Sequence, residues 1–387
     1  MPEKLRMPTR EGTLIDYTVE GNFLYADGGS QPRTRLPYAA VHVVADALAD
    51  TTPVSPAAID WEATLAFRRH IWRYGLGVAE AMDTAQRGMG LDWQACKELI
   101  RRSVAEAKAA GGRIVCGAQT DQLRPDSARS LEDVIAAYEE QCGFVEGEGG
   151  QVVLMASREL ARIATGPDDY LKVYGRVLSQ LERPALIHWL GEAFDPLLAG
   201  YWGSADLDRA MATCLEIIRA QPLKVDGVKL SLLDQRREIV MRSGLPNGVR
   251  MYTGDDFDYP TTIGGDGEYH SDALLGAFDV IAPAASAALA ALDEGDKIRF
   301  ERILEPTVPL SRHIFEAPTF YYKTGVVFVA YLNGHQDHFK MVGGLESGRS
   351  TVHLAETFML ADRAGLLRDP ELAVDRMRAV LKLAGAD

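Results

Sequence analysis

The sequence has few cysteines and few lysines. Its four cysteines, Cys96, Cys116, Cys142 and Cys214, are 20, 26 and 72 residues apart and form no CxxC pair. This spacing argues against a disulfide framework and against a zinc ribbon, and a reducing cytoplasm is the expected location. Of the 41 basic residues only 10 are lysines and 31 are arginines, so a lysine within an apolar strand is unusual for this chain.

Long apolar runs, a basic surface and nucleotide-binding motifs are also missing. The first 18 residues contain no apolar signal-peptide segment, and no later run is long enough to span a bilayer. The 41 basic and 55 acidic residues give a net charge of -14, which disfavours nucleic acid and anionic membranes as partners. Neither GxGxxG nor GxxxxGK[ST] occurs, so a dinucleotide or P-loop nucleotide site is not supported. We expect a soluble, unprocessed protein.

What the sequence does contain is a regular alternation of short apolar or β-branched runs with amphipathic segments of 12 to 20 residues. This alternation is typical of repeated β-α units and a parallel sheet. Eight strands would close a barrel, whereas five or six would leave an open, doubly wound sheet. The eight candidate strands are 39–46, 77–84, 113–119, 151–157, 184–190, 226–232, 249–254 and 272–278.

The two ends of the chain follow other patterns. Residues 1–33 form an N-terminal extension, in which 13–19 and 22–26 are predicted to pair as a hairpin. From 284 to 387 helical segments follow one another, and the apolar, aromatic segment 320–332 suits either a core or a subunit contact. We therefore predict an α/β fold with a TIM (β/α)8 barrel over 34–283, followed by a C-terminal helical domain.

One lysine occurs in the sixth candidate strand. The two-residue period of a strand puts Val228 and Leu230 on one face and Lys229 and Ser231 on the other. The apolar face suits the surrounding helices, so Lys229 should point into the barrel, where desolvation lowers the pKa of its amine. A neutral amine attacks a ketone or an aldehyde to form an imine, and the imine is an electron sink for breaking or making a neighbouring bond.

The alternative for Lys229 is an interior ion pair without a chemical role. Asp255, Asp256 and Glu80 are the acidic partners that the predicted strands bring within reach. The pattern alone does not decide between the two interpretations, because structural ion pairs also perturb pKa values.

The order of the surrounding motifs adds an argument. Residues 58–93, followed by RIVCGAQ, PALIHWL, DGVKLSLLD and YTGDD, resemble the dihydrodipicolinate synthase and N-acetylneuraminate lyase family of Schiff-base aldolases over about residues 38–385. HWLGE, FDP and GYWG indicate a divergent branch, the DUF993 group. The resemblance implies a TIM barrel in which Lys229 forms the imine. It also implies that no cofactor or metal is required, and that the protein is a homo-oligomer, either a dimer or a tetramer.

The sequence departs from the family pattern after the second strand. Members of the family carry Gly-Thr-Thr-Gly-Glu there to hold the carboxylate of a 2-oxo acid, whereas this chain reads Asp83-Thr84-Ala85-Gln86-Arg87. The lost donors argue against pyruvate as the substrate. Arg87 either replaces them through a bidentate pair or is a solvated residue at a helix start.

In the fifth strand, His188 stands where the family has a tyrosine that relays protons. Because Ile187 and Trp189 take the opposite face, His188 should face inward. Histidine titrates near neutrality and can act as general acid and base, although a packed histidine without a chemical role is the alternative. We predict that His188 assists proton transfer.

Further polar residues lie in or after strands that should line the barrel. Those of the seventh strand lie where barrel active sites assemble, and they either bind substrate, orient His188 or cap the next helix. His42 and Glu80 are either substrate contacts or members of an interior ion pair. The predicted substrate-binding residues are His42, Glu80, Asp83, Thr84, Arg87, Ser231, Tyr252, Asp255 and Asp256.

The predicted function is therefore that of a Schiff-base aldolase or lyase acting on a small oxo acid or keto sugar through Lys229. Two alternatives remain, a metal-dependent aldolase or sugar isomerase and a barrel that binds a sugar without turning it over. No HExxH or similar compact motif supports the metal alternative, although His335 and His338 are spaced to meet on one helical turn. Its candidate ligands are His188, His270, His335, His338 and Glu80.

Overall fold

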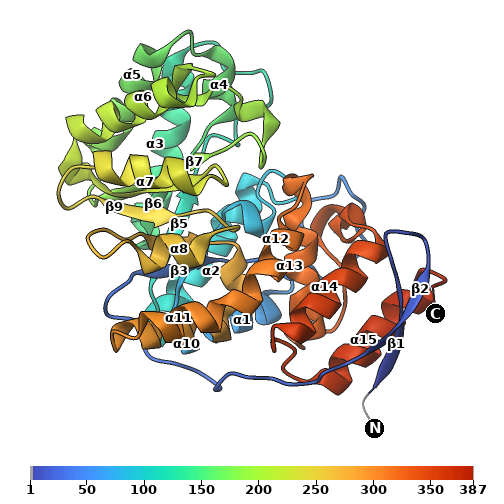
Figure 1. The fold of residues 1–387 in the computed structure, drawn as a ribbon. Helices are drawn as coiled ribbons and strands as arrows, with labels where there is room; N and C mark the ends of the chain where they lie inside the picture. Colours follow the sequence, from blue (N-terminus) through green and yellow to red (C-terminus); the bar gives the residue numbers. More distant parts are fainter. Residues whose placement is uncertain (1–2, 387) are drawn as a thin grey trace.

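The computed structural model describes residues 3–386 and contains a closed barrel of parallel strands. The strands follow one another around the ring in the order β10-β3-β4-β5-β6-β7-β8-β9, and helices follow each strand along the chain (Figure 1). The predicted (β/α)8 barrel is confirmed, and each candidate strand overlaps an observed one, although the candidate 39–46 shares only residues 39–40 with the first strand. The strands are β3 (Pro37–Ala40), β4 (Gly77–Glu80), β5 (Ile114–Ala118), β6 (Gln151–Met155), β7 (Ala185–Leu190), β8 (Val225–Ser231), β9 (Arg250–Thr253) and β10 (Asp272–Leu275).

The helices around the barrel begin at polar residues that the sequence supplies. Asp60, Asp92 and Asp206 accept hydrogen bonds from backbone N–H groups of the first helical turn, and Ser130 forms a capping box with Asp133. The helices are α1 (Trp61–Arg73), α2 (Trp93–Ala110), α3 (Leu131–Glu148), α4 (Arg158–Ile163), α5 (Pro167–Gln180), α6 (Leu207–Ala220), α7 (Gln235–Gly244), α8 (Tyr259–Gly264), α9 (Ala277–Val280) and α10 (Ala282–Asp293).

Two apolar layers hold the barrel together. The larger one lies between strands and helices, and the smaller one fills the interior with Tyr38, Tyr252, Leu186 and their neighbours. Gly227 leaves room for the interior layer, because a Cβ at this position would lie 2.6 Å from the Tyr252 ring. The interior is therefore a packed apolar core, as is usual in this fold, and polar side chains are left for the strand ends.

The C-terminal helices pack against the barrel and one another. They are α11 (Lys297–Leu304), α12 (Val308–Ile314), α13 (Tyr322–Leu332), α14 (Thr351–Arg363) and α15 (Pro370–Leu383). Every residue of α13 is buried within the single chain, which places residues 322–332 of the apolar segment 320–332 in the core. Helix α10 begins at Ala282 and continues through the boundary expected at 283–284. Across residues 3–386, no helix combines the length and the apolar character that crossing a membrane requires.

The N-terminal hairpin differs from the predicted one. Strand β1 (Lys4–Pro8) pairs with β2 (Leu14–Thr18), so the predicted pairing of 13–19 with 22–26 is wrong. The backbone N–H groups of Glu20 and Gly21 instead donate to the carboxylate of Asp362 on α14, at 2.8 and 3.0 Å. A partner more than 300 residues away therefore holds the segment that was expected to form the turn. In Figure 1 the hairpin lies against α14 and α15, close to the C-terminus.

Candidate active site

Lys229 lies in β8 with its side chain inside the barrel, as the alternation of the strand predicts. Val228 and Leu230 belong to the apolar layer outside the strands. Lys229 is only 7% exposed. Burial lowers the pKa of its amine, and the more distant charges of Asp256 and Asp83 partly oppose this change. Among the described residues Nζ of Lys229 has no hydrogen bond and no ion pair, so the interior ion pair considered for Lys229 does not form.

Gly254, directly after β9, makes room for this lysine. A Cβ at this position would lie 2.9 Å from Cε of Lys229 and 2.3 Å from Oγ of Ser231. The Gly254 N–H donates to the carbonyl of Leu230 at 3.0 Å, which holds the loop against β8. Any larger residue at 254 would displace the lysine side chain.

His188 lies beside Lys229 on the inner face of the barrel. The two residues are register partners where β7 and β8 pair, and Nε2 of His188 lies 3.2 Å from Oγ of Ser231. Nδ1 is buried and has no hydrogen-bond partner among the described residues. Burial, assisted by the Lys229 charge, holds the pKa of His188 well below its usual value, so the imidazole is neutral. A buried, unpartnered polar atom of this kind calls for an explanation, and a bound molecule is one.

The two aspartates after β9 have different surroundings. Asp256 is buried, and burial raises its pKa to about 7. Its Oδ1 accepts the Ala277 N–H at 2.8 Å, and it is the acidic group with the largest effect on Lys229. Asp255 instead accepts the N–H groups of Phe257 and Asp258, at 2.9 and 3.3 Å, and so shapes its own loop. Asp256, rather than Asp255, is therefore the aspartate whose charge acts on the Lys229 amine.

The segment after β4 brings Asp83 and Thr84 to the same end of the barrel. They lie in a short 3-10 turn, Asp83–Ala85, which follows Ala81 with a left-handed φ of 54°. Backbone strain of this type often occurs at functional sites. Oγ1 of Thr84 lies 2.8 Å from the hydroxyl of Tyr322 on α13. Asp83 is half-buried, whereas Thr84, His188, Lys229 and Asp256 are buried.

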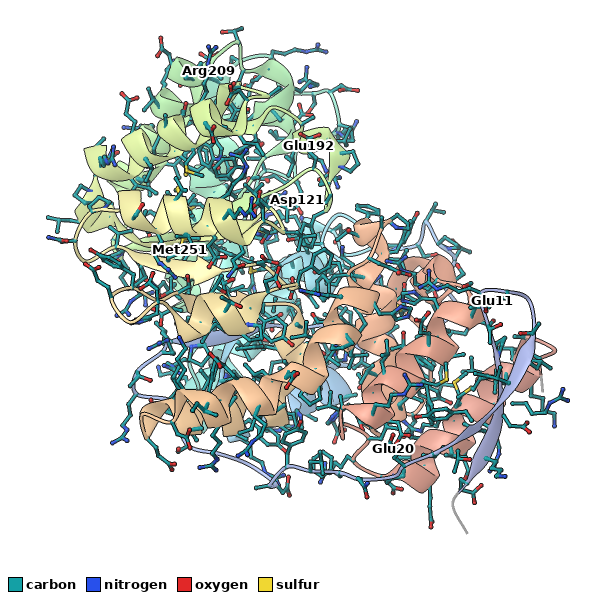
Figure 2. The ribbon with its side chains drawn as sticks, in the orientation of Figure 1. Glu11, Glu20, Asp121, Glu192, Arg209 and Met251 are labelled. Atoms are coloured by element: carbon teal, nitrogen blue, oxygen red, sulfur yellow. The ribbon has the colours of Figure 1, made fainter. Side chains whose placement is uncertain are left out.

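Helix α13 covers this end of the barrel. The ring of Tyr322 packs against Phe194, which follows β7, at a centroid distance of 5.9 Å. The hydroxyl of Tyr322 reaches the loop after β4, and its ring is stacked on Phe315 at 4.4 Å. Figure 2 labels Asp121 and Glu192, which follow β5 and β7, on the side of the barrel that faces these C-terminal helices.

Lys323, next to Tyr322, is a second buried amine that the sequence analysis missed. Burial lowers its pKa to about 8, although the charges of Asp83 and Asp195 oppose this change. Its Nζ donates to the carbonyl of Phe320 at 3.2 Å and lies 4.5 Å from the centre of the Tyr322 ring. The sequence does contain a signal for this residue, because Lys323 is a lysine within an apolar helical segment of a chain that has few lysines. Unlike Lys229, this amine has partners that stabilise its charged form.

Arg87 is part of the protein interior. Its Nε and Nη2 bind the Asp121 carboxylate at 2.9 and 2.7 Å, and Nη1 donates to the carbonyls of Ala81 and Gly117 at 3.2 and 2.7 Å. Nη2 also donates to Gln141. All five N–H groups are therefore engaged, and none is left for a substrate carboxylate. The solvated alternative is wrong as well, because Arg87 is buried.

Glu80 forms a buried ion pair and His42 a buried hydrogen bond, which corresponds to the structural alternative considered for them. Both carboxylate oxygens of Glu80 accept from Arg68 on α1, at 2.9 Å each. Nδ1 of His42 lies 2.8 Å from Asp279 on α9. Glu80 shares its strand face with Val78, which belongs to the outer apolar layer. These contacts leave both residues out of the candidate site.

Tyr252 faces the interior but points away from the amine. Its hydroxyl donates to Asp226 at 2.6 Å, and Asp226 lies at the beginning of β8, whereas Lys229 lies further along that strand. Its ring packs near Tyr38 in the interior apolar layer. Tyr252 therefore forms part of the barrel floor, which does not support the prediction that it contacts substrate.

The histidines considered for a metal-dependent enzyme do not come together. Among residues 3–386, the group of His, Cys, Asp and Glu side chains close enough to share a metal ion is a different one, His313, Glu316 and His353. His335 and His338 follow the end of α13, so they do not share the helical turn that the metal alternative would need. The ring of His335 packs instead on that of His70, at 4.2 Å.

Comparison with known proteins gives a family and a set of similar barrels. The family model described as "Protein of unknown function (DUF993)" matches residues 5–386. Dihydrodipicolinate synthase from Bacteroides thetaiotaomicron has a TM-score of 0.64 at 14% identity, covering 85% of this chain and 99% of that one. The 4-hydroxy-tetrahydrodipicolinate synthase from Methylacidiphilum fumariolicum has a TM-score of 0.63 at 13% sequence identity, and the match covers 89% of this chain and 99% of that one. Dihydrodipicolinate synthase from Aquifex aeolicus has a TM-score of 0.59 at 12% sequence identity, and the match covers 91% of this chain and 98% of that one. No curated protein matches the chain.

Proposed function

Because the chain belongs to the DUF993 family and has the barrel fold of the dihydrodipicolinate synthases, we propose that it is a Schiff-base aldolase or lyase that uses Lys229. The observation that carries the proposal is the state of this amine. Nζ is buried without an ionic partner, lies beside a neutral imidazole, and is within the electrostatic influence of a carboxyl group with a pKa of about 7. A desolvated amine with a lowered pKa is the form that attacks carbonyl groups at neutral pH.

The reaction begins with attack of the neutral Lys229 amine on the substrate carbonyl carbon. The carbinolamine loses water, and the protonated imine then draws electrons from the neighbouring bond as that bond breaks. The resulting enamine takes up a proton, and water hydrolyses the imine to regenerate the amine. One water molecule is released and one is consumed, so the cycle needs no external oxidant or reductant.

Proton transfer in this cycle is assigned to Asp256. A general acid and base is most effective when its pKa lies near the working pH, and the pKa of Asp256 is raised to about 7. The pKa of His188 is far below neutrality, so His188 is a poor proton donor. In this proposal His188 and Ser231 hold the substrate by hydrogen bonds.

The surroundings favour a small substrate with an anionic or polyhydroxyl end, such as an oxo acid or a keto sugar. Lys323 supplies a cation at the mouth, and Asp83 and Thr84 supply groups that bind hydroxyls. The residues around the amine are nearly all buried, which favours small substrates. Arg87 and Tyr252 have no part in this proposal.

Borohydride trapping tests the proposal, and the chain supplies its own control in the second buried amine. Wild-type protein, Lys229→Arg and Lys323→Arg are incubated with a panel of small oxo acids and keto sugars, reduced with borohydride and mapped by peptide mass spectrometry. We expect a covalent mass increase on Lys229 in wild type and Lys323→Arg, and none in Lys229→Arg. An adduct on Lys323 instead, or turnover of a panel member by Lys229→Arg, would overturn the assignment.

A further inference from the structure

A second polar cluster lies outside the barrel, where α12, α14 and the N-terminal hairpin meet. His313 on α12, Glu316 just after it and His353 on α14 each offer one ligand atom, and these atoms lie within 4.8 Å of one another. Nδ1 of His353 is 3.2 Å from Oε1 of Glu316, and Nδ1 of His313 is 3.9 Å from the same oxygen. Ligands of a tetrahedral zinc ion are about 3.3 Å apart, given bonds of about 2.0 to 2.1 Å. The proposed chemistry at Lys229 uses none of these residues.

The orientation of His313 is already that of a metal ligand. Its Nε2 lies 3.0 Å from the backbone carbonyl of His353, and because a carbonyl only accepts, the ring proton is on Nε2. Nδ1 of the same ring faces the carboxylates of Glu316 and Glu356, and the Glu356 oxygen is 3.6 Å away. A hydrogen bond from the other ring nitrogen to a backbone carbonyl is how proteins commonly fix a metal-binding histidine.

A positive charge already occupies this place. Arg10, in the turn between β1 and β2, extends its guanidinium between the two glutamates. Its Nη2 lies 2.9 Å from Glu316 Oε1 and its Nε 3.0 Å from Glu356 Oε2. Nη2 is also 3.4 Å from Nδ1 of His313. The Arg10 side chain is 56% exposed, and exposed ion pairs contribute little to stability, so an incoming cation can replace it.

We propose that His313, Glu316 and His353 bind a divalent transition metal, zinc above all, and that Glu356 completes the site when Arg10 moves out. Two imidazoles with carboxylates suit zinc, whereas Mg²⁺ and Ca²⁺ prefer ligand sets made of oxygen alone. A cavity of about 230 Å³, lined in part by Arg10, Glu316 and His353, gives the ion a path to the cluster. The metal joins α12 to α14 and releases the tip of the hairpin.

Zinc binding to the full-length protein tests the site. Purified protein is stripped with chelator, loaded with Zn²⁺ or Co²⁺ and analysed for bound metal and for Co²⁺ absorption. We expect one equivalent with a tetrahedral Co²⁺ spectrum. His353→Gln and Glu316→Gln should weaken binding at least tenfold, and the control His338→Gln should leave it unchanged. Equal binding by His353→Gln and His338→Gln would overturn the proposal.

Arg10 provides a second test that does not depend on the folding of the ligand variants. Arg10→Ala removes the competing cation, so it should bind Zn²⁺ severalfold more tightly than wild type. Zinc should also accelerate cleavage by trypsin after Arg10 severalfold in wild type but not in His353→Gln, which controls for any effect of zinc on the protease. An unchanged affinity in Arg10→Ala would contradict the competition. Lys229→Ala should bind zinc as wild type does, which separates this site from the proposed reaction.

Discussion

Lys229 and His188 are direct neighbours across the parallel pair formed by β8 and β7, and both side chains lie inside the barrel. Burial lowers the pKa of each group, and the charge of Lys229 lowers that of His188 further. Two groups that repel each other when both are charged are thus held side by side, and each lowers the tendency of the other to take up a proton. A carbonyl compound that reaches the amine also meets the imidazole.

Gly254→Ala tests the room that the amine needs. The added methyl group would lie 2.9 Å from Cε of Lys229 and 2.3 Å from Oγ of Ser231, so the lysine side chain must shift. We expect borohydride trapping on Lys229 to fall at least tenfold while the protein remains folded by circular dichroism. Gly143→Ala on α3 is the matched control, because nothing lies within 4 Å of its added methyl group. Equal trapping in both variants would show that the position of the amine does not depend on Gly254.

Asp256→Asn tests the electrostatic link between the carboxylate and the amine. Only the neutral amine reacts, so labelling of Lys229 by formaldehyde and cyanoborohydride should rise with pH through the lysine pKa, which burial places below 10.5. The Asp256 charge raises this pKa, so its removal should move the midpoint of the labelling curve to lower pH. Asp255→Asn, whose carboxylate is engaged in its own loop, should move it less. A midpoint that stays in place or rises in Asp256→Asn would contradict the assignment.

Lys323→Met tests the cation at the mouth of the barrel. The Lys323 ammonium is expected to attract anionic carbonyl compounds, so trapping of glyoxylate on Lys229 should fall at least fivefold in the variant. Trapping of uncharged glycolaldehyde should change by less than twofold, because it does not depend on that charge. An equal loss with both reagents would indicate a general distortion of the site rather than recognition of charge.

Glu238→Gln tests a buried acid that supports the loop after β9. The hydroxyls of Thr253 and Ser271 donate to its carboxylate at 2.8 and 2.7 Å, and burial raises its pKa from 4.5 to about 7. The folded protein keeps this proton up to about pH 7, whereas the unfolded chain releases it above about pH 4.5. The stability that Glu238 contributes is therefore present below pH 4.5 and is lost as pH rises to 7, by at most about 3 kcal/mol.

In urea denaturation at pH 5 and pH 7.5, the variant should lose less free energy of unfolding between the two pH values than wild type does. The glutamine is neutral in both states and takes no part in the linkage. An identical loss in the two proteins would show that Glu238 does not hold a proton in the folded state.

The barrel and the inner face of its strands were predictable from the sequence, because the alternation of side chains along a strand is a local property. The same period put Lys229 and His188 inside. Applied to β4 it puts Glu80 on the face of Val78, which the structure shows to be the outer one, so the prediction that Glu80 lines the barrel was wrong. Alternation does not tell whether an inward-facing side chain lies toward the carboxyl end or the amino end of the barrel strands. For that reason Tyr252 was predicted at the wrong end.

The remaining features depend on contacts between distant segments. Arg87 finds Asp121 in the loop after β5, and Tyr322 reaches Thr84 from a helix 238 residues further along the chain. No local pattern specifies where a C-terminal helix docks on a barrel. The cluster of His313, Glu316 and His353 was missed for the same reason, since His353 comes from a different helix than His313. The predicted dimer or tetramer stays a prediction.

Helix α13 also has a consequence for the order of events during translation. The last barrel strand ends at Leu275, whereas Tyr322, the first residue of the covering helix, comes 47 residues later. At about 5 to 20 residues per second, the ribosome adds these residues in about 2 to 10 seconds, and during this interval helix α13 is not yet available to cover Lys229. On the proposed function, the nascent chain is therefore exposed to reaction with free aldehydes until α13 has been synthesised.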